Sequence, residues 1–191
     1  MKFATLLVAL AACAIAQTKQ EKQDLVKSLQ DSLKTIEASL KGVSNEQFKF
    51  KAAPNRWSIA ECAEHVALTE PFIRQTIANQ VMKAPAPPKR MSKAEDSKLY
   101  DGIADRSKRA SAPGEIAPKG VYTTPAEALK ALRASRRDSI AWIKSNKDDM
   151  RAHWGESFKM DAYQYFTLIA AHTVRHTKQI EEVKQSANYP K

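Results

Sequence analysis

Two of the four histidines in this 191-residue chain have a spacing that could bind one metal ion. His172 and His176 are separated by four residues, so on a helix they share a face and lie one turn apart. On an apolar face, each neutral imidazole needs partners for its ring nitrogens, and a shared divalent cation would satisfy one nitrogen of each. The spacing alone leaves two interpretations open: a metal site, or histidines hydrogen-bonded within a core.

The other two histidines differ in where the sequence places them. His65 lies on a second predicted helix, on a flank from which it could also reach the interior, whereas His153 falls in a predicted loop beside Trp154. We expect His153 to be an ordinary loop histidine. Glu61, one turn before His65, is a weak candidate for a catalytic base, but its spacing from Ser58 is that of a capping box, which we expect to be its main role.

Four amphipathic helices are predicted to position these side chains. Apolar residues recur with helical period over Lys19–Lys41, Ser58–Met82, Pro125–Lys147 and Asp161–Ser186. The first three begin with the pattern of a capping box. Pro71 inside the second predicts a kink or local break. No segment alternates convincingly with period two, so no substantial sheet is expected.

The connection between the second and third helices is unusually long. Residues 83–123 contain five prolines, and the segment is far longer than the two to eight residues that usually join antiparallel helices in bundles. We therefore expect a Pro-containing crossover that makes these two helices parallel. The predicted fold is an all-α four-helix bundle with up-down-down-up order.

The composition excludes several classes of protein. Five glycines argue against a turn-rich β-sandwich, and two cysteines argue against a disulfide-rich fold or a cysteine-rich zinc module. The formal charge of +10 suggests an anionic partner, but no nucleic-acid-binding motif accompanies it. We expect a solvated basic face, or weak adhesion to an anionic membrane surface, and no nucleic-acid partner. On the third helix this face comprises Lys130, Arg133, Arg136, Arg137, Lys144 and Lys147.

The N-terminus is typical of an export signal. An apolar run up to Ala16 is shorter than the about 20 residues that a membrane-spanning helix needs. Two processing routes remain open: cleavage after Ala16, which leaves a soluble periplasmic or secreted protein, or a lipoprotein anchored to a membrane at Cys13. Residues 1–16 are thus predicted to be a signal peptide and 17–191 a single domain. Within that domain we expect Cys62 to be a buried apolar residue on a helix.

Two motifs in this order resemble the DinB / YfiT-like superfamily of small metal-binding four-helix bundles. They are Trp57-Ser58-x-x-Glu61-x-x-x-His65 and His172-x-x-x-His176-x-x-Gln179. The resemblance implies that His65, His172 and His176 bind one divalent metal ion. Imidazole ligands suit Zn, Ni or Fe and do not choose among them. Gln179 could orient a ligand histidine or be a polar residue at the rim. Trp57 is expected to pack where its helix begins, with an aromatic wall of a pocket as the alternative.

The resemblance also implies classes of function. Three histidines leave coordination positions open, as in catalytic metal sites. Members of the superfamily include thiol S-transferases and thiol-dependent isomerases, which use cytosolic thiols, so an exported member would need another thiol or a reaction such as metal-assisted hydrolysis. The alternative is a non-catalytic extracytoplasmic protein that binds a metal or small ligand. The sequence leaves open whether the protein is an enzyme, and a homodimer through an exposed helix face is compatible with it.

Overall fold

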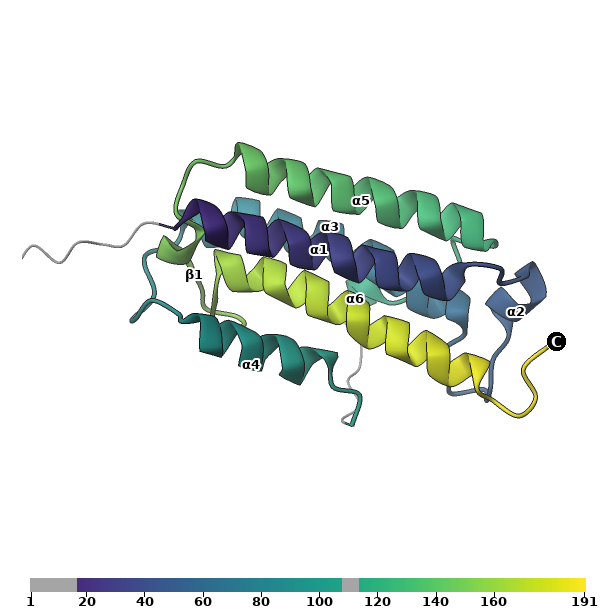
Figure 1. Ribbon diagram of the computed structural model, residues 1–191. Helices are drawn as coiled ribbons and strands as arrows, with labels where there is room; N and C mark the ends of the chain where they lie inside the picture. Colours follow the sequence, from purple (N-terminus) through teal and green to yellow (C-terminus); the bar gives the residue numbers. More distant parts are fainter. Residues whose placement is uncertain (1–16, 108–113) are drawn as a thin grey trace, which may run out of the picture.

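The computed structural model describes residues 17–107 and 114–191, and its core is a bundle of four long helices (Figure 1). These helices are α1 (Lys19–Leu40), α3 (Ile59–Asn79), α5 (Pro125–Ser145) and α6 (Ala162–Lys184). The helices α1 and α6 run in one direction and α3 and α5 in the other, which is the predicted up-down-down-up order (Figure 1). The predicted all-α four-helix bundle is therefore confirmed. The predicted signal peptide, with Cys13, lies outside the described residues.

Capping residues explain where the long helices begin. The side chains of Thr18, Ser58 and Thr124 form capping boxes at α1, α3 and α5, as predicted, and Asp161 forms one at α6. The four long helices end one to three residues earlier than predicted. The helix α3 continues through Pro71 without a break and ends at Asn79.

Several shorter elements connect the bundle helices. They are α2 (Asn45–Lys49), α4 (Lys93–Ala104), three 3-10 turns, η1 (Val81–Lys83), η2 (Gly114–Ile116) and η3 (Met150–Ala152), and two short strands, β1 (Trp154–Gly155) and β2 (Met160–Asp161). The strands pair antiparallel, Trp154 with Asp161 and Gly155 with Met160. They cover two residues each, so the expectation of no substantial sheet holds for the described residues.

The crossover contains a helix that the sequence reading missed. Residues 93–104 form α4, which begins with a capping box between Ser92 and Glu95 and packs along α6 (Figure 1). At the C-terminal end of α4, Arg175 of α6 donates to the carbonyl of Ile103, and Lys178 donates to the carbonyl of Ala104 at 3.1 Å. Cations at the carboxyl end of a helix satisfy its last carbonyls. The crossover is therefore fixed on the helix that carries two of the histidines.

A buried polar network lies between two apolar clusters of the core. Arg136 is 1% exposed, and its Nε donates to the Glu70 carboxylate at 2.9 Å, while its Nη2 donates to the Thr173 hydroxyl at 3.0 Å. The prediction that Arg136 belongs to a solvated basic face is therefore wrong. Arg136 follows Leu132 by four residues and so lies on the apolar stripe of α5, which faces the core.

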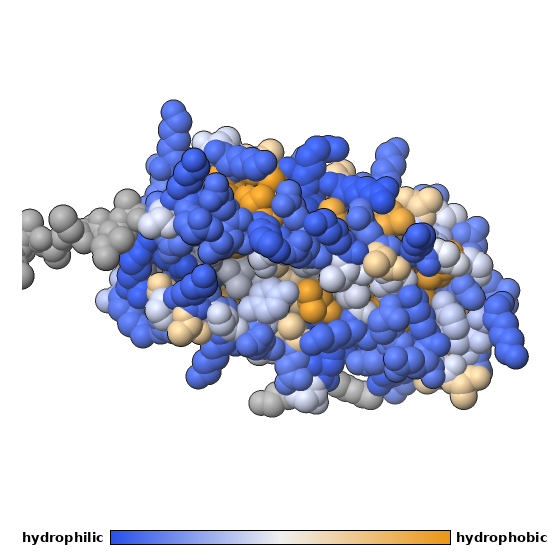
Figure 2. All heavy atoms as spheres, in the orientation of Figure 1, coloured by the Kyte–Doolittle hydropathy of each residue, from blue (hydrophilic) through white to orange (hydrophobic). Residues whose placement is uncertain are grey.

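Hydrophilic side chains cover most of the surface seen in Figure 2, where hydrophobic side chains are visible mainly along the seam between α1 and α5. On the remaining basic face, Arg133 pairs with Glu37 at 2.6 Å and Arg137 with Asp138 at 3.6 Å. Among the described residues, none of the helices has the length and apolar character needed to cross a bilayer.

Candidate metal centre

The imidazoles of His65, His172 and His176 converge in the interior of the bundle. His65 comes from α3 and the other two from α6. The Nε2 atom of His172 lies 3.0 Å from that of His65 and 3.1 Å from that of His176. One ligand atom from each residue lies within 4.8 Å of the others, so the three could hold a single ion.

His65 is oriented by the crossover segment. Its Nδ1 lies 2.7 Å from the backbone carbonyl of Ile116, in η2. A carbonyl oxygen only accepts, so Nδ1 of His65 carries the hydrogen and Nε2 presents its lone pair to the other two rings.

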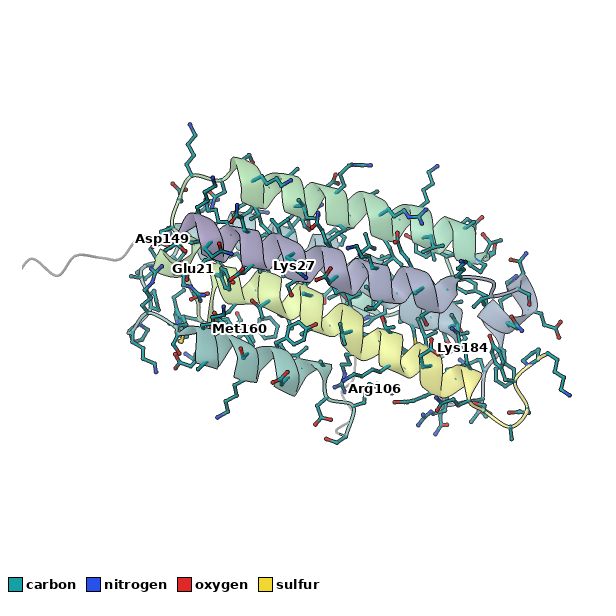
Figure 3. All side chains as sticks on the ribbon, in the orientation of Figure 1. Glu21, Lys27, Arg106, Asp149, Met160 and Lys184 are labelled. Carbon is teal, nitrogen blue, oxygen red and sulfur yellow. The ribbon has the colours of Figure 1, made fainter. Side chains whose placement is uncertain are left out.

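His176 is oriented in the same way by a side chain on its own helix. Its Nδ1 lies 2.9 Å from Oε1 of Gln179, and Arg106 donates its Nη1 hydrogen to the same oxygen at 3.1 Å. Arg106 follows α4 and lies against α6 (Figure 3). There it also donates to the Glu182 carboxylate. A guanidinium is only a donor, so Oε1 is the amide oxygen and His176 donates to it. From the sequence, two roles are open for Gln179, orienting a ligand histidine or lying at the polar rim. Its contact with His176 agrees with the first role.

These hydrogen bonds make the cluster suitable for a cation. Because Nδ1 of His65 donates to Ile116 and Nδ1 of His176 donates to Gln179, the Nε2 atoms of these two neutral rings carry no hydrogen. His172 can offer at most one hydrogen to them. At least one close nitrogen pair therefore has no hydrogen between its atoms, and a shared cation would satisfy all three lone pairs. Two nitrogens each about 2.0–2.1 Å from a tetrahedral ion lie roughly 3.4 Å apart, close to the two separations that involve His172. The donor set fits one divalent transition-metal ion.

Burial keeps the three imidazoles neutral. Loss of hydration lowers the pKa of His65 and lowers the pKa of His176 well below its usual value. Burial, with added repulsion from His65 and Arg175, lowers the pKa of His172 to about 3. At neutral pH all three side chains are therefore in the form that binds metal ions.

Trp57 borders the cluster. Its ring meets His65 edge-on, with centroids 5.0 Å apart, and stacks on His176, with centroids 5.8 Å apart. Trp57 also packs against the apolar cluster at the start of α3, as mainly expected from the sequence. Trp57 precedes His65 by eight residues, and this spacing does not predict that the two rings are in contact.

Glu61, His153 and Cys62 have other contacts. The Glu61 carboxylate accepts from the backbone of Ser58 at 2.7 Å and from Lys51 at 2.9 Å, so its capping role is confirmed. Nδ1 of His153 contacts the carbonyl of Ala84 at 3.2 Å, outside the cluster. Cys62 is fully buried as expected, and burial raises the pKa of its thiol, which keeps it protonated.

Together, the up-down-down-up helices and the three inward histidines define a four-helix-bundle protein with a candidate mononuclear metal centre. The sequence signature of the DinB superfamily matches residues 28–180, a range that includes all three histidines, and the chain belongs to this superfamily.

Two Bacillus subtilis proteins are similar to the chain. The uncharacterized protein YuaE of strain 168 is 25% identical over an alignment of 149 residues, and the match covers 76% of this chain and 88% of YuaE. The solved structure of YfiT, described as a probable metal-dependent hydrolase with an unusual four-helix bundle topology, superimposes with a TM-score of 0.55. That match covers 92% of this chain and 93% of YfiT at 14% sequence identity, which shows a shared fold.

Proposed function

We propose that the protein is a metal-dependent hydrolase that binds one Zn, Ni or Fe ion through His65, His172 and His176. The observation that carries this proposal is the convergence of three Nε2 atoms. Two of them, in His65 and His176, carry no hydrogen because Nδ1 of the same ring donates a hydrogen bond. Three protein ligands leave a coordination position open, which is typical of catalytic sites.

A bound ion would supply Lewis-acid chemistry and lower the pKa of a coordinated water. The chain itself supplies the geometry. Ile116 and Gln179 hold two imidazoles in the metal-binding tautomer, and the Trp57 ring stacks on that of His176. None of the described carboxylates belongs to the cluster, and Glu61 is engaged in its cap, so we assign no protein side chain as a general base.

Hydrolysis is favoured over thiol transfer for two reasons. YfiT, which shares the fold, is described as a probable metal-dependent hydrolase. We also propose that the protein is exported, either as a soluble protein or as a lipoprotein anchored at Cys13, and export would separate it from cytosolic thiols. The absence of a described carboxylate in the cluster favours a second candidate, a non-catalytic metal- or small-ligand-binding protein.

Chelation and metal restoration test the proposal. Residues 17–191 would be purified, stripped with a chelator and reloaded separately with Zn, Ni or Fe. Each form would then be assayed with chromogenic esters, phosphoesters and amides. We expect turnover only in a reloaded form, its loss in His172→Ala and its retention in His153→Ala. Turnover that requires an added thiol would indicate a transferase instead. Full metal content without turnover of any substrate would favour the binding protein.

A further inference from the structure

Glu64 is a buried carboxylate that the candidate metal centre does not use directly. It is 1% exposed and accepts hydrogen bonds from three successive backbone amides, those of Lys119 at 2.7 Å, Gly120 at 2.9 Å and Val121 at 3.1 Å. Gly120 has φ +76°, a backbone conformation that glycine adopts readily and that lets consecutive amides turn toward one anion. These three charge-assisted bonds offset the cost of burying the carboxylate.

The segment that Glu64 holds also orients a histidine of the cluster. Three residues before Lys119, the carbonyl of Ile116 accepts the hydrogen bond from Nδ1 of His65. Because Glu64 and His65 are adjacent on α3, residues 116–121 are attached at both ends to neighbouring positions of one helix. Pro118 lies between the two attachments and fixes one backbone dihedral of this short segment.

We propose that Glu64 is a positioning residue for His65. By holding the amides of residues 119–121, it fixes the Ile116 carbonyl, and that carbonyl keeps the His65 ring oriented with hydrogen on Nδ1 and the lone pair of Nε2 toward the cluster. The inference rests on the proposed metal site and deepens it. The charge matters, because the amide of a glutamine has only one oxygen and would turn an NH₂ group toward a backbone N–H.

The first test needs no metal. Ring-nitrogen NMR of the metal-free protein would compare the wild type with Glu64→Gln. Glu115→Gln would be the matched control, because Glu115 is an exposed carboxylate in η2, directly before Ile116. We expect the Nδ1–H tautomer of His65 in the wild type and the control, and a shift toward the Nε2–H tautomer in Glu64→Gln. An unchanged His65 tautomer in a folded Glu64→Gln protein would overturn the proposal.

The second test measures metal binding and coordination. Changing the outer partners of a metal ligand weakens affinity by about 10–100-fold, and we expect about tenfold weaker Co²⁺ binding in Glu64→Gln, with an altered Co²⁺ absorption spectrum. Glu115→Gln should bind as the wild type does. Gly120→Ala keeps the carboxylate but strains the amides that it binds, and should change affinity and spectrum in the same direction. A folded Glu64→Gln protein with wild-type affinity and spectrum would contradict the positioning role.

The two proposals fail in different ways. A wild-type protein that binds no metal would refute the proposed function, while the NMR comparison would still decide whether Glu64 orients His65. Normal metal binding with an unchanged His65 ring in Glu64→Gln would refute the positioning role alone. If Glu64→Gln does not fold, Gly120→Ala decides: an unchanged His65 tautomer in that folded variant would contradict the proposal, and a shift toward Nε2–H would support it.

Discussion

At the scale of single residues, the candidate centre depends on the partners on the outer side of each imidazole. Ile116 and Gln179 accept from the outer nitrogens of His65 and His176, and this contact decides which nitrogen faces inward. Arg106 donates to the same oxygen of Gln179 and thereby fixes the amide orientation. The chemistry of the histidines is therefore set by residues that come from the crossover and from one turn farther along α6.

Gln179→Ala should weaken metal binding without unfolding the bundle. Loss of the acceptor frees the His176 ring to rotate and change tautomer, and we expect a loss of about tenfold in Co²⁺ affinity. Gln185→Ala is the matched control, because Gln185 is exposed at the end of the same helix. Titration with a competing chelator would measure both, and equal affinities for the two variants would show that Gln179 does not orient the ligand.

The metal-free protein should lose stability in acid because of His172. Burial lowers its pKa from the ordinary histidine value of 6.5 to about 3 in the folded state, so the unfolded chain binds more protons between these pH values. The free energy of unfolding should therefore fall as the pH decreases from 6.5 toward 3. Relative to His172→Asn, the wild type should lose at least about 1 kcal/mol over this window. Urea unfolding across the pH series measures the difference, and parallel curves would contradict this assignment.

At the scale of the elements, local signals made the four long helices predictable. Capping boxes and the helical period involve residues a few positions apart, so the starts of α1, α3 and α5 could be read directly from the sequence. The sequence does not predict α4, because the prolines and mixed charges of the crossover around it are typical of a linker, although Ser92 and Glu95 carry the same capping signal. Arg136 was misplaced because its residue type outweighed its position on the apolar stripe.

Part of the candidate site can likewise be predicted from local spacing, and part depends on contacts between residues far apart in the chain. The pairing of His172 with His176 is a local spacing. The helical pattern places His65 on a flank that could reach the interior, and the family resemblance assigns it as the third ligand. The contact of His65 with Ile116 joins residues 51 positions apart, and the contact of Arg106 with Gln179 joins residues 73 positions apart. Such contacts depend on how the crossover packs, for which a single sequence carries no periodic signal.

Arg136 and Glu70 should be strongly coupled in stability. Arg136→Ala leaves a buried carboxylate without its partner and should cost about 3–5 kcal/mol in the free energy of unfolding. Combining Arg136→Met with Glu70→Leu should recover most of that loss. Arg137→Ala, at the exposed neighbouring position, should change stability by less than about 0.5 kcal/mol. Chemical denaturation tests this, and equal losses for Arg136→Ala and Arg137→Ala would rule out a structural role for the pair.

At the scale of the whole molecule, the described domain begins at one end of the bundle and ends at the other (Figure 1). Gln17 and Thr18 both have structural contacts, because Gln17 accepts from the backbone of Met150 and Thr18 caps α1. Cleavage after Ala16 would therefore keep these two contacts. The proposed export also agrees with a metal site built from histidines, which needs no reduced cysteine.

The processed N-terminus should distinguish the two proposed export routes. Expression of the full chain in a bacterial host, followed by fractionation and mass spectrometry, should yield a soluble protein that begins at Gln17. A membrane-associated protein that begins at a lipid-modified Cys13 would support the alternative route. A full-length cytoplasmic protein that retains Met1 would contradict export altogether.

The metal content of the purified domain tests the central claim most directly. Inductively coupled plasma mass spectrometry should find one equivalent of a divalent transition metal per chain in the wild type and in His153→Ala. The single variants His65→Ala, His172→Ala and His176→Ala should each lose most of it, because every one removes a third of the donor set. Full metal content in all three variants, together with its loss in His153→Ala, would contradict the assignment of this centre.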